Sequence, residues 1–143
     1  MKFSALKGNA DNEPRWQKDI PGMGDIELLV RSTNNPDYRK RFQAMVRALP
    51  PSKKAKGVID PVELDRITGV CLLDHSLSDW KNVEGEKCEA VPYSKEQATI
   101  FLTTPEYGAF RDGVLTAAVS VGDEDAESEE QMEKNSAAPS DTN

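Results

Sequence analysis

Histidine, cysteine and aromatic residues are scarce in this sequence. Among 143 residues there are one histidine, His75, and two cysteines, Cys71 and Cys88, and only 6% of the residues are aromatic. A single histidine excludes a metal site with two histidine ligands. The three residues also lack the fourth ligand and the closely spaced cysteine pair of a structural zinc site. We therefore expect no metal and no cofactor, and two reduced thiols instead of a disulfide, because no secretion signal precedes them.

Long apolar runs are absent as well. No stretch of about 18 apolar residues is present to form a membrane-spanning helix. Lys2 is not followed by the apolar segment of a signal peptide. We therefore expect a soluble cytoplasmic protein that does not associate with a membrane.

The residues for nucleophilic catalysis are equally few. Cys71 and His75, four residues apart, are the only cysteine and histidine at a spacing that places both side chains on one helix face. A histidine in a last helical turn commonly complements the helix C-terminus, and a cysteine on an apolar stripe is usually part of a core. Gly22-Met23-Gly24 lacks the third glycine of a phosphate loop and precedes a strand pattern. We expect no catalytic residue and no enzymatic activity.

Charge is abundant but unevenly placed. The formal net charge is -7, and residues 123–143 contain eight acidic residues and a single basic one, Lys134. The first 122 residues therefore carry 17 acidic and 17 basic residues. This balance argues against nucleic-acid binding through a dominant basic surface. We expect a flexible arm over residues 1–14, a single globular domain over residues 15–122 and a disordered acidic tail over residues 123–143.

Four helix starts are marked by local signals. Asn35, Asp60 and Thr104 each precede a proline, which pairs an N-cap residue with proline at the first helical position. Ser94 begins a capping box, and Gly122 is a suitable stop for the last helix. Apolar residues at spacings of three and four follow each start. The sequence thus predicts helices over residues 35–49, 60–74, 94–102 and 104–121.

Two segments show the pattern of β-hairpins. Over residues 15–31, apolar and polar residues alternate on both sides of Pro21-Gly22-Met23-Gly24, which is typical of a turn. Apolar residues in 77–83 and 88–91 flank Gly85 in the same way. Because an isolated hairpin is marginal in water, both are expected to pack on the helices. The predicted fold is α+β and helix-dominant, with about four helices, two small β-hairpins and the disordered acidic C-terminal tail.

A series of short motifs runs through residues 15–121. In order they are Ile20-Pro21-Gly22, Leu28-Leu29-Val30-Arg31, Asn35-Pro36-Asp37-Tyr38-Arg39, a helix running into Trp80, Val91-Pro92-Tyr93-Ser94, Thr104-Pro105-Glu106-Tyr107 and Phe110-Arg111-Asp112. This order resembles the tail assembly chaperones of long-tailed bacteriophages.

The resemblance implies a small, mainly helical, non-enzymatic protein of the infected host cytoplasm. Such a protein binds the tape-measure protein, keeps its long apolar helices in solution, helps to recruit the major tail tube protein and is absent from the mature virion. The resemblance also implies a longer, frameshifted form of the same chain. The alternative is a structural tail-completion or connector subunit, which would remain in the virion.

Four aromatic residues are candidates for partner contact: Trp80, Tyr93, Tyr107 and Phe110. Trp80 lies beside a turn and is expected to be partly exposed, whereas the spacing of Tyr107 and Phe110 is typical of a core stripe. Aromatic helices on a neutral body suit an amphipathic partner helix.

The first predicted helix has a basic flank. Its members are Arg39, Lys40, Arg41 and Arg47. Two interpretations stay open: this flank meets the acidic tail of its own chain, or it meets an acidic partner.

Glu133-Lys134-Asn135 suggests a frameshift site. It can be encoded as GAA-AAA-AAC, which contains A-AAA-AAC, a heptamer on which ribosomes slip back by one nucleotide. Ser52-Lys53-Lys54 allows a comparable run inside the domain, where slippage would truncate the fold. We hypothesise that slippage at Glu133 to Asn135 appends a longer C-terminal domain to a minority of chains.

Overall fold

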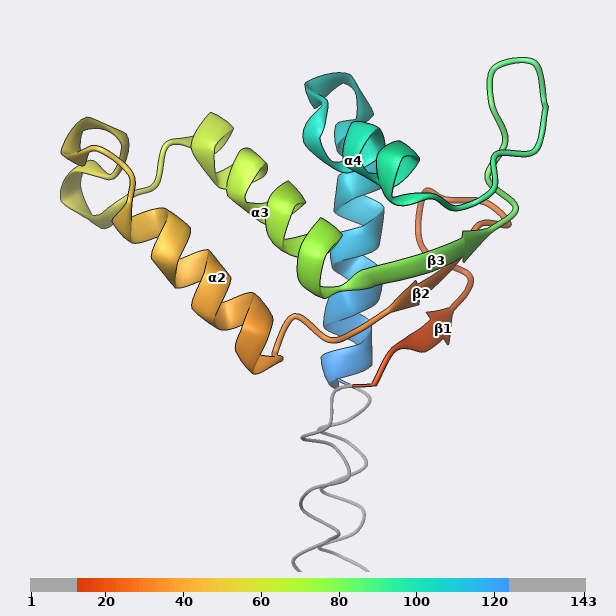
Figure 1. Cartoon of the computed structure of the whole chain (residues 1–143), viewed down its shortest axis with the longest axis horizontal. Helices are drawn as coiled ribbons and strands as arrows, with labels where there is room; N and C mark the ends of the chain where they lie inside the picture. The colour runs from red at the N-terminus through yellow and green to blue at the C-terminus, as the bar shows by residue number, and fades with distance from the viewer. Residues whose placement is uncertain (1–12, 124–143) are drawn as a thin grey trace, which may run out of the picture.

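The computed structural model describes residues 13–123 and has an α+β, helix-dominant fold (Figure 1). The last helix carries no label in the figure, and its described part spans residues 108–123. The other elements are the strands β1 (Arg15–Gln17), β2 (Glu27–Val30) and β3 (Leu77–Lys81), the helices α2 (Pro36–Arg47), α3 (Pro61–His75) and α4 (Lys95–Thr103), and the 3-10 turns η1 (Pro51–Lys53), η2 (Ala55–Gly57) and η3 (Pro105–Tyr107).

The three strands form one antiparallel sheet in the order β1-β2-β3. The first hairpin is confirmed, because β1 pairs with β2 and the amide of Met23 donates to the carbonyl of Ile20 at 3.0 Å in the turn. Gly22 supplies the positive φ of 80° that this turn requires. Leu28 and Val30 alternate inward on β2 and are fully buried. The sheet therefore covers the helices with one apolar face.

The second expected hairpin differs from the sequence-based picture. β3 pairs with β2, placing Trp80 opposite Leu28, instead of pairing with the segment that follows Gly85. That segment turns back on the residues that follow β3: Glu84 and Ala90 form an isolated antiparallel bridge, and the amides of Gly85 and Val91 donate to the carbonyls of Glu89 and Val83, each at 2.8 Å. Ala90 is exposed, so a second strand there would bury little apolar surface, whereas pairing with β2 buries the inner face of β3.

Three of the four expected helix starts are confirmed. The side chains of Asn35, Asp60 and Ser94 accept hydrogen bonds from the backbone amides three residues ahead, at 2.8, 3.3 and 3.1 Å. Thr104 is different, because it makes no side-chain cap and Pro105 begins η3, with the α-helix starting at residue 108. Gly122 does not stop the helix and lies within it. A Cβ at this position would lie only 2.7 Å from the Ser32 hydroxyl oxygen. This close approach explains why a glycine, which has no Cβ, occupies position 122.

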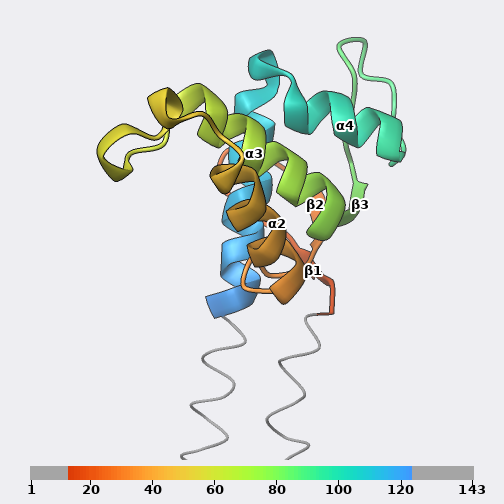
Figure 2. The same cartoon turned by 60° about the vertical axis from the view of Figure 1, so that its left-hand side comes forward.

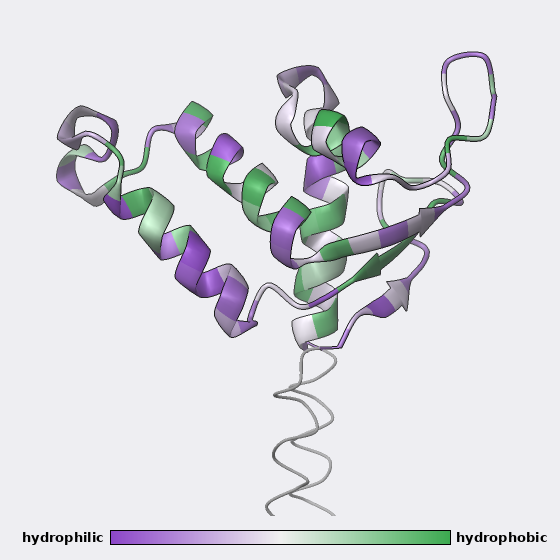
Figure 3. Ribbon diagram, viewed as in Figure 1, coloured by the Kyte–Doolittle hydropathy of each residue, from purple (hydrophilic) through white to green (hydrophobic). Residues whose placement is uncertain are grey.

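The core lies between the sheet and the helices. α3 contacts both α2 and α4, and Figure 2 shows these three helices and the last helix grouped around one centre. Val114, Ala118 and Val121 are buried along one face of the last helix, as the expected stripe requires. The hydropathy colouring of Figure 3 shows apolar residues on the last helix and on β2, whereas the start of α2 is hydrophilic. The described residues include all of the expected 15–122 domain, and most of the arm and tail lie outside them.

Candidate binding surfaces

The four aromatic candidates lie together in one cluster. The ring of Trp80 on β3 is 5.0 Å from that of Tyr93 and 5.8 Å from that of Phe110, measured between centroids. Phe101 of α4 joins them, with its ring 5.6 Å from Trp80 and 5.2 Å from Tyr107. The structure thus brings together residues from β3, α4, η3 and the last helix, and it adds Phe101, which was not among the four candidates.

Trp80 itself is a core residue. Only 4% of its surface is exposed, and its indole nitrogen donates to the carbonyl of Val91 at 2.7 Å. The expectation of partial exposure is wrong, because β3 is not the arm of an isolated hairpin and its inward face packs under α4. What reaches the surface is the rim of the cluster, where Tyr107 and Ile100 are 37% and 46% exposed. The cluster mainly stabilises the fold by edge-to-face ring packing.

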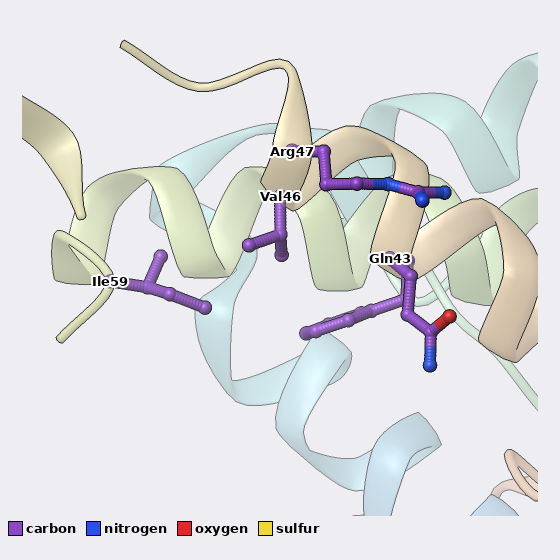
Figure 4. Close-up of a pocket in the computed structure, with 5 residues that line it drawn as sticks. Gln43, Val46, Arg47 and Ile59 are labelled. Carbon is purple, nitrogen blue, oxygen red and sulfur yellow. The ribbon is translucent and has the colours of Figure 1, made fainter. Parts of the chain in front are cut away.

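A second surface runs along α2 and consists of two neighbouring hollows. The larger has a volume of about 360 Å³, and Figure 4 shows Val46 and Ile59 directed into it. The smaller has a volume of about 230 Å³ and reaches Leu115 on the last helix. Both are open to solvent, and Phe42 and Gln43 line both. We call the two together the α2 groove, and its lining residues are Thr33, Tyr38, Arg39, Phe42, Gln43, Val46, Arg47, Ile59 and Leu115.

The sequence of α2 explains why this groove is apolar. Tyr38, Phe42 and Val46 are spaced by four residues and therefore form one row along the helix. Tyr38 is buried and its ring stacks on that of Phe42 at 6.2 Å, whereas Phe42 and Val46 remain half-buried. Burial raises the pKa of Tyr38 to about 12, with a smaller contribution from Cys71. The phenol is therefore neutral, and the floor of the groove carries no negative charge.

The loop after α2 holds the far end of the groove in place. The ammonium group of Lys54 donates to the carbonyls of Val46 and Arg47 at 3.2 and 3.0 Å, which caps the C-terminus of α2. The amide of Asp60 donates to the carbonyl of Lys53 at 2.7 Å. These bonds fix the chain on both sides of η2, so that Ile59 lies against the end of α2.

A row of polar residues borders the apolar row. Arg39, Gln43 and Arg47 are also spaced by four residues, and all three are exposed. Among the described residues that line the two hollows, only Arg39 and Arg47 are charged. Of the basic flank noted in the sequence, Arg41 instead approaches Asp74 at 3.9 Å. The α2 groove is thus apolar with one positively charged edge.

The spacing of the apolar residues predicts the stripe along α2, but it does not identify this groove. The feature of the sequence that could have indicated the groove is the basic loop at residues 52–57, which follows shortly after this helix. A polar loop of this kind offers few apolar side chains to cover the end of an apolar stripe, which favours exposure of part of that stripe. The sequence does not show which part, because this depends on how α2 packs on α3.

The two cysteines lie in different environments. Cys71 is buried and Cys88 is exposed, and both are free thiols. Burial raises the pKa of Cys71 to about 11, while Arg41 lowers it and Asp74 raises it further. Since the thiolate is the nucleophile, Cys71 is a poor one near neutral pH. His75 contributes its backbone carbonyl, which accepts a hydrogen bond from the side chain of Asn35.

Residues 13–123 also bear on two other kinds of site. Within this range, no group of three or more histidine, cysteine or acidic side chains is placed to hold a metal ion. The helices described there are too short or too polar to cross a bilayer. The suggested frameshift residues, Glu133 to Asn135, lie outside the described range.

Comparison with known proteins gives one match. A family model described as YdaY prophage protein matches residues 33–135, a range that begins just before α2 and includes all of the α2 groove. No curated protein and no solved structure matches the chain.

Proposed function

The chain belongs to the YdaY prophage protein family, and on that premise we propose that it is a non-enzymatic tail assembly chaperone of a bacteriophage. The phage origin that this family indicates agrees with the resemblance carried by the motifs between residues 15 and 121. In this proposal the protein acts in the host cytoplasm during tail morphogenesis and is absent from the finished particle.

The proposed partner is the tape-measure protein, and the observation that carries the proposal is the α2 groove. A chaperone for long apolar helices needs an apolar surface that stays open to solvent in the free protein. The groove offers half-buried Phe42 and Val46 next to Ile59, without a described segment of the chain lying over them. The major tail tube protein and a frameshifted longer form of the chain are further proposed partners.

The alternative is a tail-completion or connector subunit, and particle composition distinguishes it from a chaperone. Mass spectrometry of lysates from infected cells and of purified virions measures the chain in both. We expect the chain in the lysate and not in the virion. A fixed ratio of the chain to the tail tube protein in purified particles would contradict the chaperone proposal and support the structural one.

The frameshift proposal is tested by the gene. The codons for Glu133, Lys134 and Asn135 should contain the A-AAA-AAC heptamer, followed by an open reading frame in the minus-one phase. Other codons, or an early stop in that phase, would overturn it. The chaperone proposal does not depend on this outcome.

A further inference from the structure

We propose that the α2 groove binds a single amphipathic helix of the tape-measure protein whose apolar row is bordered by a row of acidic residues. This inference rests on the proposed function and deepens it, because it assigns the binding surface and the chemistry of the bound segment.

The length of the groove suits a short helix. α2 has 12 residues, which corresponds to about 18 Å along its axis. A partner helix that lies along it presents about three turns, and its apolar side chains at spacings of three and four would contact Tyr38, Phe42 and Val46. Ile59 and Leu115 form the apolar boundaries at the two ends of this contact.

The positive charge along the edge of the α2 groove favours a partner helix with acidic residues along one side. Arg39 and Arg47 are eight residues apart on α2, a separation of about 12 Å along the axis. Arg39 donates to the Asn34 side chain at 3.4 Å, and neither arginine forms an ion pair with any residue of the described range. Two carboxylates seven or eight residues apart on a helix beside α2 would match them. Gln43 lies between the arginines and can pair with a polar residue.

The acidic segment at residues 124–143 is a less suitable occupant. It has the right charge, but Met132 is its only large apolar residue. Its side chains therefore cannot fill an apolar row made by three residues of α2. Residues 1–12 contain Phe3 and Leu6, but their charge is unsuitable because Lys2 and Lys7 would meet the arginine edge. An external helix with both an apolar row and an acidic row satisfies both requirements.

Two synthetic peptides test the chemistry directly on the full-length chain. Both carry the same leucine row over 18 residues, with glutamates at the bordering positions in one and lysines in the other. Fluorescence anisotropy should show that the glutamate peptide binds about tenfold more tightly, since its glutamates can form exposed ion pairs with Arg39 and Arg47 whereas the lysines are repelled. This preference should shrink with added salt. Equal affinity of the two peptides would overturn the proposal.

Charge reversal on the protein provides the matched comparison. The double variant Arg39→Glu/Arg47→Glu should reverse the peptide preference, while Lys18→Glu/Lys87→Glu changes the net charge equally at exposed sites outside the groove and should leave it unchanged. In the apolar row, Val46→Ser should weaken binding of the glutamate peptide, and Ile100→Ser, at the rim of the aromatic cluster, should not. Loss of binding with Ile100→Ser alone would place the site on the aromatic cluster and overturn the proposal.

Two further measurements would identify the other possible occupants of the α2 groove. Light scattering that shows a dimer for the wild type and a monomer for Val46→Ser would identify a second copy in the groove. Methyl resonances of Val46 and Ile59 that shift when Glu127, Glu129 and Glu130 are changed to glutamine would identify the chain's own acidic segment. Either result would overturn the assignment to an external helix.

Failure of this inference can be told apart from failure of the proposed function. If the wild-type chain co-purifies with the tape-measure protein and Arg39→Glu/Arg47→Glu does so equally well, the groove assignment is wrong and the chaperone function stands. If the wild type does not co-purify with the tape-measure protein, the proposed function fails, and the groove assignment, which rests on it, fails with it.

Discussion

The side-chain amide of Asn35 donates a hydrogen bond of 3.0 Å to the backbone carbonyl of His75, and so joins the start of α2 to the end of α3. The same amide group donates to the carbonyl of Ser32 at 2.7 Å, and its oxygen accepts from the backbone amide of Tyr38 at 2.8 Å. Asn35 is fully buried, so these groups cannot exchange their partners for water. Because α2 and α3 meet here, this residue helps to set the position of the α2 groove.

Replacing Asn35 should therefore be costly. Asn35→Ala removes the helix cap and leaves the carbonyls of Ser32 and His75 without this donor, which should lower the free energy of unfolding by about 2–4 kcal/mol. Urea denaturation followed by circular dichroism measures the change. Asn34→Ala, at the exposed neighbouring position, is the control and should change stability by less than about 0.5 kcal/mol. Equal effects of the two variants would contradict the linking role of Asn35.

Gly69 should not tolerate a side chain. A Cβ there would overlap the backbone carbonyl oxygen of Leu102, so Gly69→Ala must push α3 and α4 apart. We expect a loss of about 2–3 kcal/mol in the free energy of unfolding, despite the higher helix propensity of alanine. Gly108 is the matched control, since a Cβ there meets only the guanidinium end of the Arg111 side chain, at 3.3 Å. Gly108→Ala should stay within about 1 kcal/mol of the wild type, and a smaller cost at Gly69 than at Gly108 would refute the close helix contact.

Stability should fall above pH 9 because of Cys71. Its pKa is raised from 9.0 to about 11 in the folded protein, so the folded state keeps a proton that the unfolded state releases between these values. Stability is therefore full below pH 9 and decreases up to pH 11, with a slope of at most about 1.4 kcal/mol per pH unit from this group. Tyr38, raised to about 12, adds a decrease of the same sign above pH 10.

The variant Cys71→Ala isolates the contribution of the thiol. Its unfolding free energy, measured by urea titration at several pH values between 8 and 11, should fall less steeply than that of the wild type. The comparison uses slopes, since loss of the buried side chain also lowers the overall stability. Identical slopes in the two proteins would show that the thiol ionises equally easily when folded.

The parts of this fold that were predicted from sequence are those that depend on neighbouring residues. The caps at Asn35, Asp60 and Ser94 act within one helical turn, so each is visible in four consecutive residues. The turn at Gly22 is local in the same sense. The pairing of β2 with β3 joins residues about 50 positions apart, and no short pattern specifies it. The burial of Trp80 follows from that pairing, which is why its exposure was predicted wrongly.

In the candidate binding surfaces, too, features set by neighbouring residues were predicted, whereas features set by the packing of distant segments were not. The four aromatic candidates lie together because β3 and α4 pack against the last helix, and their contact with a partner stays a prediction. The α2 groove was not predicted, although both its rows are visible in the sequence of α2. Whether a helical stripe is covered or open depends on the helices around it, here α3 and the last helix.

The central claim is tested most directly by the amount of tape-measure protein that stays in solution. The tape-measure gene of the same phage is expressed alone and together with the full-length chain, and the soluble fraction of the tape-measure protein is measured after centrifugation. The account predicts that the tape-measure protein aggregates alone and remains soluble, in a complex that can be isolated, when the chain is present. A tape-measure protein that is equally soluble in both cultures, without a complex, would contradict it.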